Sequence, residues 1–162
     1  MRYEELRRAE LRLANSADSV WATIPVALPV RGATLTSSFT PRRFHPILHR
    51  VRPHWGVDLA AASGTPVLAS ADGIVLEALW NASYGNVIDV SHAHGRYITR
   101  YAHLSVISVK VGDPVRRGQV IGRVGSTGLS SGPHLHFEVF VEGRRRDPAL
   151  LFDPGAAAGL LR

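Results

Sequence analysis

Short apolar runs, separated by glycine, proline or polar residues, fill the chain from about residue 33 onward. Runs of this length are typical of β-strands, and tight turns at glycine favour antiparallel pairing. No helix-period segment lies between them to support a parallel α/β fold. The pattern predicts strands at Thr34–Ser38, Val57–Ala60, Pro66–Ser70, Gly73–Leu79, Asn86–Ser91, Tyr97–His103, Gln119–Val124 and His134–Val141. The sequence therefore predicts an all-β domain of antiparallel sheets.

The N-terminal part of the chain has a different pattern. Residues 3–17 combine leucine and alanine with paired glutamate and arginine, which favours a charged amphipathic helix. Pro25, Pro29 and Gly32 then interrupt regular structure. We expect residues 1–32 to form a short helix and linker, residues 33–153 the domain, and residues 154–162 a C-terminal tail.

One sequence pattern recurs inside the domain. Gly-Thr-Pro-Val at 64–67 leads into a predicted strand, much as Gly-Asp-Pro-Val does at 112–115. A pseudo-duplicated hairpin explains the recurrence, and chance reuse of a common turn sequence explains it equally well.

Composition and charge narrow the chemistry. A length of 162 residues suits one domain, and the absence of cysteine leaves only His, Asp and Glu as metal ligands. The net charge of +6 indicates an anionic partner. The basic clusters lack interleaved aromatic residues, which argues against nucleic acid. No apolar run reaches the roughly 18–20 residues of a membrane span, and the N-terminus lacks the apolar region of a signal peptide.

Two histidines begin the last predicted strand. Because strand side chains alternate, His134 and His136 share one face, where one can bind a metal while the other transfers protons. A surface pair without a role is the alternative interpretation.

Two further groups of residues add to this pair. His54 and Asp58 flank Gly56, which disfavours a helix between them. With one histidine of the strand pair they give three ligands and an open position, as in catalytic zinc sites; a structural zinc is more often closed by four ligands. His103, in Tyr-Ala-His-Leu at a predicted strand end, is a candidate acid or base, or alternatively a packed strand-end residue.

These motifs resemble those of the lysostaphin-type, or LytM-like, zinc endopeptidases. The resemblance covers roughly residues 33–153 and includes, in order, Ser38–Arg43, Pro53–Asp58, Gly64–Val67, Tyr84–Asn86, Tyr101–Leu104, Gly125–Gly128 and Gly132–Glu138. It implies the lysostaphin-type peptidase fold and a Zn2+-dependent endopeptidase that cuts peptide crosslinks of bacterial peptidoglycan.

The resemblance also implies roles for individual residues. His54, Asp58 and His136 match the zinc ligands of the family, and His103 and His134 match its catalytic pair, with the base and acid roles exchangeable. The Pro-Arg-Arg loop at 41–43 resembles Gram-negative members, which favours D-alanine–diaminopimelate crosslinks over oligoglycine bridges.

Location and partners follow from the same resemblance. We expect a periplasmic or extracellular protein whose targeting segment is absent from this sequence, with membrane contact only through an N-terminal anchor that is missing here. Peptidoglycan stems and crosslinks are the expected substrates, and envelope proteins the expected regulatory partners. The helix predicted at residues 3–17 either covers the site or joins the domain to a stalk.

Several other residues are candidates near the site. Residues 125–132 are expected to form a loop beside it, or simply a flexible turn. Glu138 shares the face of the two strand histidines, which suggests a hydrogen bond to a ligand or a salt bridge within the sheet. The groove candidates are Arg43, His45, His49 and Asn86, whereas His92 and His94 are expected to be structural.

Two rival functions remain. A non-catalytic LytM-like regulator that activates other wall hydrolases has the same fold but loses metal ligands, whereas all five histidine and aspartate positions are present here. A lipoyl-type carrier, suggested by residues 109–124 alone, needs a modifiable lysine at a hairpin tip. Lys110 is the only lysine and is not at an obvious tip.

Overall fold

The computed structural model describes Pro25 and residues 27–152 of the chain. The described residues are mostly in strands. In chain order the elements are β1 (Thr34–Ser37), β2 (Thr40–His45), β3 (Arg50–His54), β4 (Val57–Ala60), β5 (Pro66–Leu68), β6 (Gly73–Asn81), β7 (Gly85–His92), η2 (Ala93–Gly95), β8 (Tyr97–Ile107), β9 (Pro114–Val115), β10 (Val120–Val124), β11 (His134–Val141), β12 (Arg144–Arg146) and η3 (Pro148–Leu150).

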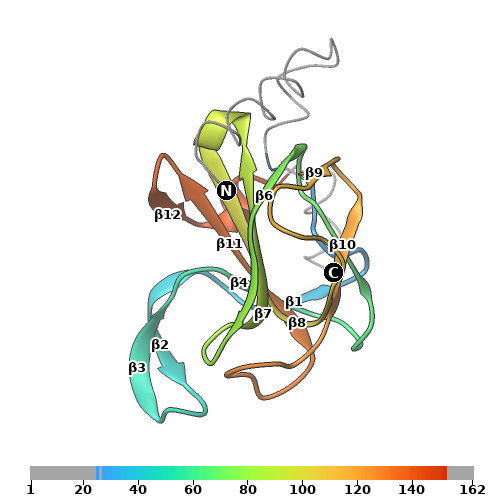
Figure 1. The fold of residues 1–162 in the computed structure, drawn as a ribbon. Coiled ribbons are helices and arrows are strands. Elements are labelled where there is room, and N and C mark those ends of the chain that lie inside the picture. The colour runs from blue at the N-terminus through green and yellow to red at the C-terminus, as the bar shows by residue number, and fades with distance from the viewer. Residues whose placement is uncertain (1–24, 26, 153–162) are drawn as a thin grey trace.

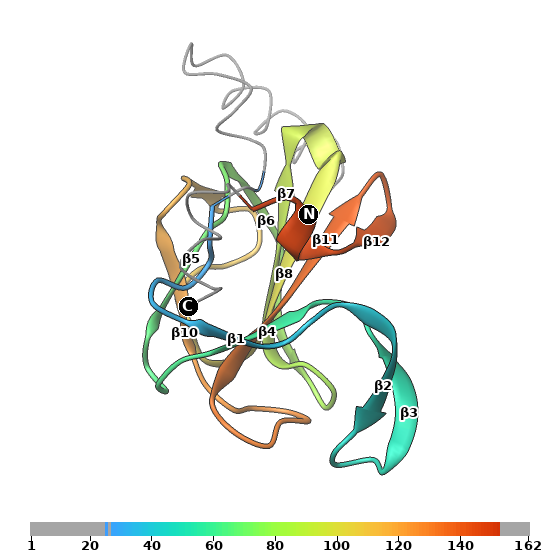
Figure 2. The same cartoon turned by 180° about the vertical axis from the view of Figure 1, so that it is seen from behind.

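Ten of these strands form one antiparallel sheet. Its main path runs β1-β4-β11-β8-β7-β6-β9, with β12 added to β11 and β10 joining β8 to β5. Strands β2 and β3 form a separate hairpin, and both views show it extending away from the main sheet (Figures 1 and 2). The hairpin therefore stands beside the sheet rather than within it.

All eight predicted strands are confirmed, β4 and β11 with the predicted bounds and the others with ends that differ by a few residues. Strands β2, β3, β9 and β12 were not predicted. The repeated Gly-x-Pro-Val segments lead into β5 and β9, and each strand pairs with one in the other half of the chain: β5 with β10, and β9 with β6. The helix predicted at residues 3–17 and the tail at 154–162 lie outside the described residues.

The core covers one face of the central strands. On β11, Leu135, Phe137 and Val139 are fully buried in the hydrophobic core. Because strand side chains alternate, the residues between them project from the opposite face. That opposite face carries His134, His136 and Glu138, so packing of the core fixes the backbone on which the candidate site is built.

Residues 109–124 do not form an independent carrier hairpin. Strand β9 pairs with β6, whereas β10 pairs with β5 and β8. The lipoyl-type interpretation is therefore wrong, because these strands are part of the larger sheet. Within the described part of the chain, no helix has the length and apolar character that a membrane crossing requires.

Candidate metal centre and histidine pair

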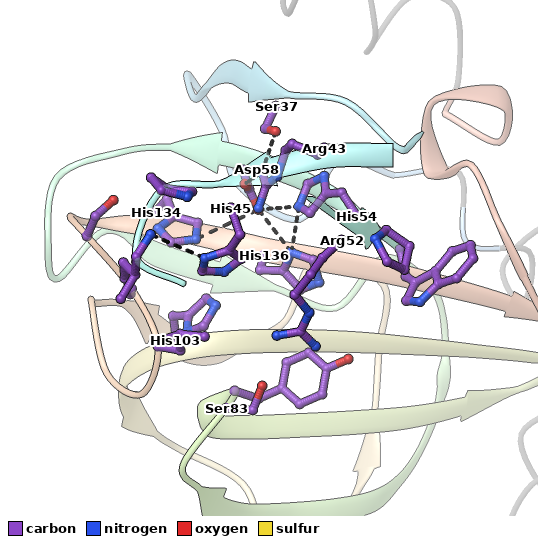
Figure 3. A pocket seen from close by; sticks show the side chains of 18 of the residues that line it. Ser37, Arg43, His45, Arg52, His54, Asp58, Ser83, His103, His134 and His136 are labelled. Carbon is purple, nitrogen blue, oxygen red and sulfur yellow. Dashed lines mark hydrogen bonds and ion pairs between the residues drawn. The ribbon is translucent and has the colours of Figure 1, made fainter. Parts of the chain in front are cut away.

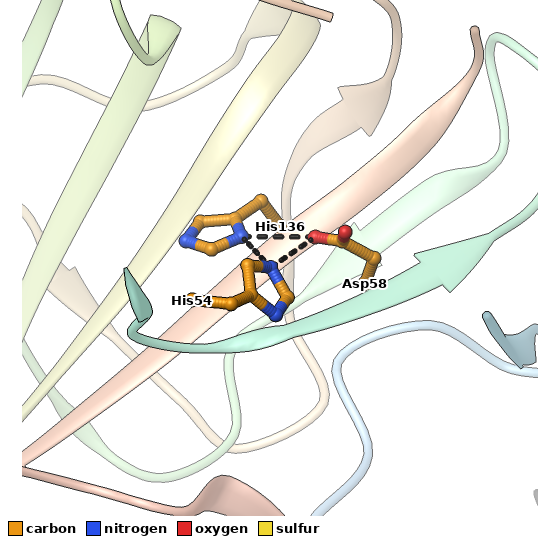
Figure 4. A group of neighbouring side chains, drawn as sticks. All are labelled: His54, Asp58 and His136. Atoms are coloured by element: carbon orange, nitrogen blue, oxygen red, sulfur yellow. Dashed lines mark hydrogen bonds and ion pairs between the residues drawn. The ribbon is translucent and has the colours of Figure 1, made fainter. Parts of the chain in front are cut away.

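Three predicted ligands meet on neighbouring strands. Asp58 on β4 lies directly opposite His136 on β11, and His54 ends β3. His54 Nε2 lies 3.0 Å from Asp58 Oδ1 and 3.2 Å from His136 Nδ1, and the latter two atoms are 2.9 Å apart (Figure 4). Donor atoms about 2.0–2.1 Å from a tetrahedral zinc lie about 3.3 Å apart, so the spacing fits such an ion.

Outer hydrogen bonds determine which nitrogens face this point. His54 Nδ1 lies 2.8 Å from the Ser38 carbonyl, which can only accept, so Nδ1 carries the proton. His136 Nε2 lies 3.0 Å from Glu138 Oε1, and a carboxylate likewise accepts. The remaining nitrogens and the Asp58 oxygen thus bring three lone pairs together. Such an arrangement is repulsive unless a cation or an extra proton lies among them.

The electrostatics of the buried triad of His54, Asp58 and His136 favour a positive charge among the three facing atoms. Burial opposes a charge on Asp58, but the neighbouring imidazoles of His136 and His54 hold the pKa of the carboxyl well below its usual range. Burial also opposes protonation of His136, yet Asp58 and Glu138 raise the pKa of this imidazole. The site therefore attracts a cation, and its donor set of two imidazoles and one carboxylate suits zinc.

The second oxygen of Asp58 is also held. Arg43 Nη1 donates to Asp58 Oδ2 at 2.9 Å and to Ser37 Oγ at 2.5 Å. This ion pair leaves Oδ1 directed at the two imidazoles. The contact links the β2–β3 hairpin to the candidate ligand set.

Glu138 is held from three directions. Its side chain is 1% exposed; Oε1 accepts from the Tyr84 hydroxyl at 2.7 Å, and Oε2 accepts from Arg145 Nε at 3.3 Å. Oε1 also accepts the hydrogen bond from His136 Nε2. The prediction of a hydrogen bond to a candidate ligand is confirmed, and so is the alternative of a salt bridge within the sheet, because Arg145 lies on β12.

A glycine brings the two ligand-bearing segments together. A Cβ atom on Gly56 would lie 2.3 Å from the Phe137 carbonyl oxygen and 3.0 Å from His136 Cε1. No side chain fits there without separating the strands. Gly56 therefore allows the turn between His54 and Asp58 to lie against β11.

The predicted catalytic pair lies beside this triad. The rings of His103 and His134 are 4.8 Å apart, and His134 Nε2 lies 3.7 Å from Asp58 Oδ1. Each ring has Nδ1 next to a loop carbonyl, Thr127 O at 2.7 Å for His103 and Gly132 O at 2.8 Å for His134. Both Nδ1 atoms therefore carry protons and each Nε2 is free to accept one. Burial lowers the pKa of His103 to about 4, which keeps this ring neutral near pH 7.

A β-bulge directs His103 toward the site. Tyr101 and Leu104 both lie in the hydrophobic core although regular alternation would put them on opposite faces. The register of β8 against β7 shifts between these positions, and His103 has a positive φ of 61°. The extra residue of the bulge restores the core contacts of Leu104 and leaves the imidazole on the other face.

The loop at residues 125–132 is tied to the strands around it. Thr127 Oγ1 donates to the Leu104 carbonyl at 2.7 Å and accepts from Asn86 N at 3.1 Å. The loop carbonyls of Thr127 and Gly132 hold the two histidines. The prediction of a loop beside the candidate site is confirmed, and its contacts give it a role in orienting both rings.

A pocket of about 460 Å³ opens over the triad and the histidine pair, and Figure 3 shows their side chains directed into it. Among the predicted groove residues, Arg43 and His45 line the pocket. Asn86 and His49 do not: the Asn86 amide donates to the Leu104 carbonyl, and the His49 ring packs on Phe44. His92 is buried, in agreement with a structural role.

Sequence reasoning missed two lining residues that matter for the site. Tyr84 begins the Tyr84–Asn86 motif, and nothing in the spacing of that motif indicates a bond to Glu138. Arg52 belongs to none of the motifs in the sequence, yet it lines the pocket. Its place on a strand of the hairpin could have been found only by recognising β3.

Comparisons with known proteins agree with this geometry. The chain is 49% identical over 110 residues to peptidoglycan DD-endopeptidase ShyA of Vibrio cholerae, a match that covers 68% of this chain and 25% of that protein. The fold is similar to that of a zinc-containing peptidase from Vibrio cholerae, with a TM-score of 0.69 and 44% identity over 74% of this chain and 37% of the other. It is also similar to the lysostaphin catalytic domain of Staphylococcus simulans, with a TM-score of 0.63 and 37% identity. That match covers 72% of this chain and 89% of the lysostaphin domain.

The chain spans about a quarter of the length of the curated relatives it matches. A match to peptidase family M23 extends over residues 52–148, which include His54, Asp58, His103, His134 and His136. The predicted family resemblance and the all-β fold are thereby confirmed, and the chain belongs to peptidase family M23.

Proposed function

We propose that this chain is a zinc-dependent endopeptidase that hydrolyses peptide crosslinks of bacterial peptidoglycan. One observation carries the proposal: three unprotonated donor atoms of His54, Asp58 and His136 converge beside two further histidines in an open pocket. A non-catalytic regulator has no need for a complete donor set or for the adjacent pair.

The roles proposed for His134 and His103 follow from where the two rings lie relative to Asp58 and the loop carbonyls. When bound, zinc supplies Lewis acidity to the scissile carbonyl and lowers the pKa of water at the site to roughly 7. The free Nε2 of His134 faces Asp58, so this ring removes the proton from the attacking water. His103, neutral and held by the Thr127 carbonyl, receives that proton from His134, whose ring lies 4.8 Å away, and delivers it to the leaving amine, so both rings end the reaction neutral. The two roles are exchangeable, and the experiment below tests the pair.

The names of the similar proteins support the proposed substrate class. ShyA is named a peptidoglycan DD-endopeptidase, and a 52% identical protein of Neisseria meningitidis is named a DD-carboxypeptidase/endopeptidase. We propose D-alanine–diaminopimelate crosslinks as the bonds cut, and the cell envelope, periplasmic or extracellular, as the place of action. Other envelope proteins are then the natural regulatory partners.

Crosslinked sacculi of the diaminopimelate type provide the test. The purified chain is incubated with them with and without a zinc chelator, and the released muropeptides are identified by mass spectrometry. We expect crosslinked dimers to fall and monomers to rise. Chelator should abolish the change, and His134→Ala should reduce it by at least a hundredfold while zinc stays bound, because that ring is not among the proposed ligands.

Bound zinc with unchanged dimers would contradict the enzymatic proposal and favour a regulator. His94→Ala is the matched control, since His94 is exposed and is not among the pocket-lining residues. It should cleave dimers at the wild-type rate.

A further inference from the structure

The β2–β3 hairpin places two arginines side by side at the pocket. Arg43 on β2 and Arg52 on β3 are cross-strand partners, so their side chains share one face of the hairpin. Both line the pocket above the metal centre, and Figure 3 draws both among its side chains. Partners of this kind have Cα atoms about 5 Å apart. Since Arg43 contacts Asp58 directly, Arg52 lies close to the reaction centre.

The two arginines differ in their partners. Arg43 is ion-paired with Asp58. The other acidic residue that lines the pocket, Glu138, is buried and already accepts from Tyr84 and Arg145. Among residues 25 and 27–152, no hydrogen bond or ion pair is formed by the exposed guanidinium of Arg52. The pocket therefore presents one arginine whose charge the surrounding chain leaves unmatched.

A second hydrogen-bond donor lies on the same face of the hairpin. His45, two residues beyond Arg43, lines the pocket, and its Nδ1 accepts from the backbone N–H groups of Ile47 and Leu48 at 3.3 and 3.2 Å. The proton of the neutral ring is consequently on Nε2. Burial, together with Arg43, Arg52 and Arg50, lowers the pKa of His45, so the ring stays a neutral donor near pH 7.

We propose that Arg52, assisted by His45, binds a free carboxylate of the substrate peptide next to the bond that is cut. A guanidinium with two parallel N–H groups matches a carboxylate in geometry as well as in charge. A second N–H from the same face adds to this match. No acidic side chain of the pocket competes, because Asp58 and Glu138 are already paired.

The proposal rests on the proposed function and narrows its substrate. In a crosslink between D-alanine and diaminopimelate, the amide nitrogen that leaves is attached to a carbon that bears a free carboxylate. A bond within an oligoglycine bridge has no such group. Amidation of the same carboxylate removes its charge and leaves the shape of the crosslink almost unchanged. The structure thus assigns to Arg52 a preference for crosslinks with this carboxylate free.

Two crosslinked dimers test the assignment, one with the free carboxylate and one with the carboxamide. The kcat/KM of the zinc-loaded full chain is measured on each for wild type, Arg52→Gln, Arg52→Lys and Arg42→Gln. We expect wild type to prefer the free carboxylate by roughly tenfold, a modest factor because Arg52 is exposed. Arg52→Gln should lose that preference with unchanged activity on the amidated dimer, and Arg52→Lys should keep part of it.

Arg42→Gln removes the same charge from the same hairpin, at an exposed residue that is not among those lining the pocket. It should keep the wild-type preference. Equal cleavage of the two dimers by wild type, or an equal loss on both in Arg52→Gln, would overturn the assignment and leave the proposed function intact. If zinc-loaded wild type cleaves neither dimer, the proposed function fails, and this inference fails with it.

Discussion

Glu138 is the residue on which the orientation of His136 depends. Its carboxylate accepts from His136 Nε2 at 3.0 Å and is itself bound by Tyr84 and Arg145. A carboxylate behind a metal-binding imidazole fixes the tautomer and makes the ligand more basic. We therefore expect the buried charge to act on a metal bound by His136 without touching it.

Neutralising the charge of Glu138 tests whether it affects metal binding through His136. We expect Glu138→Gln to weaken zinc binding by about tenfold to a hundredfold, because the amide keeps the shape of the side chain and loses its charge. Competition with a chromophoric chelator measures the affinity. Glu77→Gln, an exposed position on β6, serves as control and should bind zinc as wild type does. Equal affinities in the two variants would show that the Glu138 charge has no such effect.

His92 has a different role, because it is not among the residues that line the pocket. It is fully buried, with Nδ1 2.8 Å from the Asp72 carbonyl and Nε2 2.8 Å from the Thr99 hydroxyl. Burial lowers the pKa of this ring from 6.5 to about 4. The folded protein therefore keeps His92 neutral at pH values where the unfolded chain protonates it.

The sign of the resulting pH dependence follows directly. Between pH 6.5 and pH 4 the unfolded state binds the extra proton, so the free energy of unfolding falls as the pH is lowered through this range. The loss amounts to about 3.5 kcal/mol at most, since one pKa unit corresponds to about 1.4 kcal/mol. Urea unfolding of metal-free protein at several pH values measures it. A His92→Gln variant with the same pH dependence as wild type would contradict the assignment, as would an NMR titration of His92 near pH 6.5.

At the level of elements, the turn between β3 and β4 sets the distance between the ligand-bearing strands. Gly56 lies against the backbone of β11 at a distance that admits no Cβ. We expect Gly56→Ala to lower the free energy of unfolding by about 1–3 kcal/mol through overpacking. It should also weaken zinc binding, because His54 and Asp58 must move relative to His136.

Urea unfolding and chelator competition measure both effects in the same samples. Gly132→Ala is the control, because a Cβ there meets nothing within 4 Å and its φ is not in the left-handed region. Its stability should equal or slightly exceed that of wild type. Similar losses in both variants would show that close packing at Gly56 is not the cause.

The elements also show what the sequence could and could not predict. Strand β11 was predicted to the residue because its alternation of core and site residues is regular. The β2–β3 hairpin was missed because its strands are rich in arginine and proline and have no buried apolar face to produce a pattern. Two of its arginines, Arg43 and Arg52, line the pocket, so the arginine-rich composition that gives no strand pattern is also the basis of the proposed role of the hairpin.

For the site, the sequence predicted which residues take part but not how their side chains are oriented. The family motifs contained His54, Asp58, His103, His134 and His136, and the structure brings all five together. Their orientation could not be predicted. The bulge at His103 depends on register between strands distant in sequence, and the tautomers depend on carbonyls of Ser38, Thr127 and Gly132. The boundaries predicted for the domain, residues 33–153, stay a prediction.

For the whole molecule, the core and the candidate site share the same strands. One face of β11 packs into the interior, and the other carries two histidines and Glu138. Residues of the hairpin and of the loop at residues 125–132 line the pocket together. Because the core is well packed, it holds the donor atoms at fixed separations, as a metal centre with an open position requires.

Titration of the metal-free protein with zinc tests the central claim most directly, with bound metal and cleavage of crosslinked dimers followed in the same samples. The account predicts that cleavage rises with bound zinc and saturates at one ion per chain. His54→Ala should lose both signals, and His134→Ala should lose cleavage alone. Cleavage that persists without metal, or dimers that stay intact when one zinc is bound, would contradict the account.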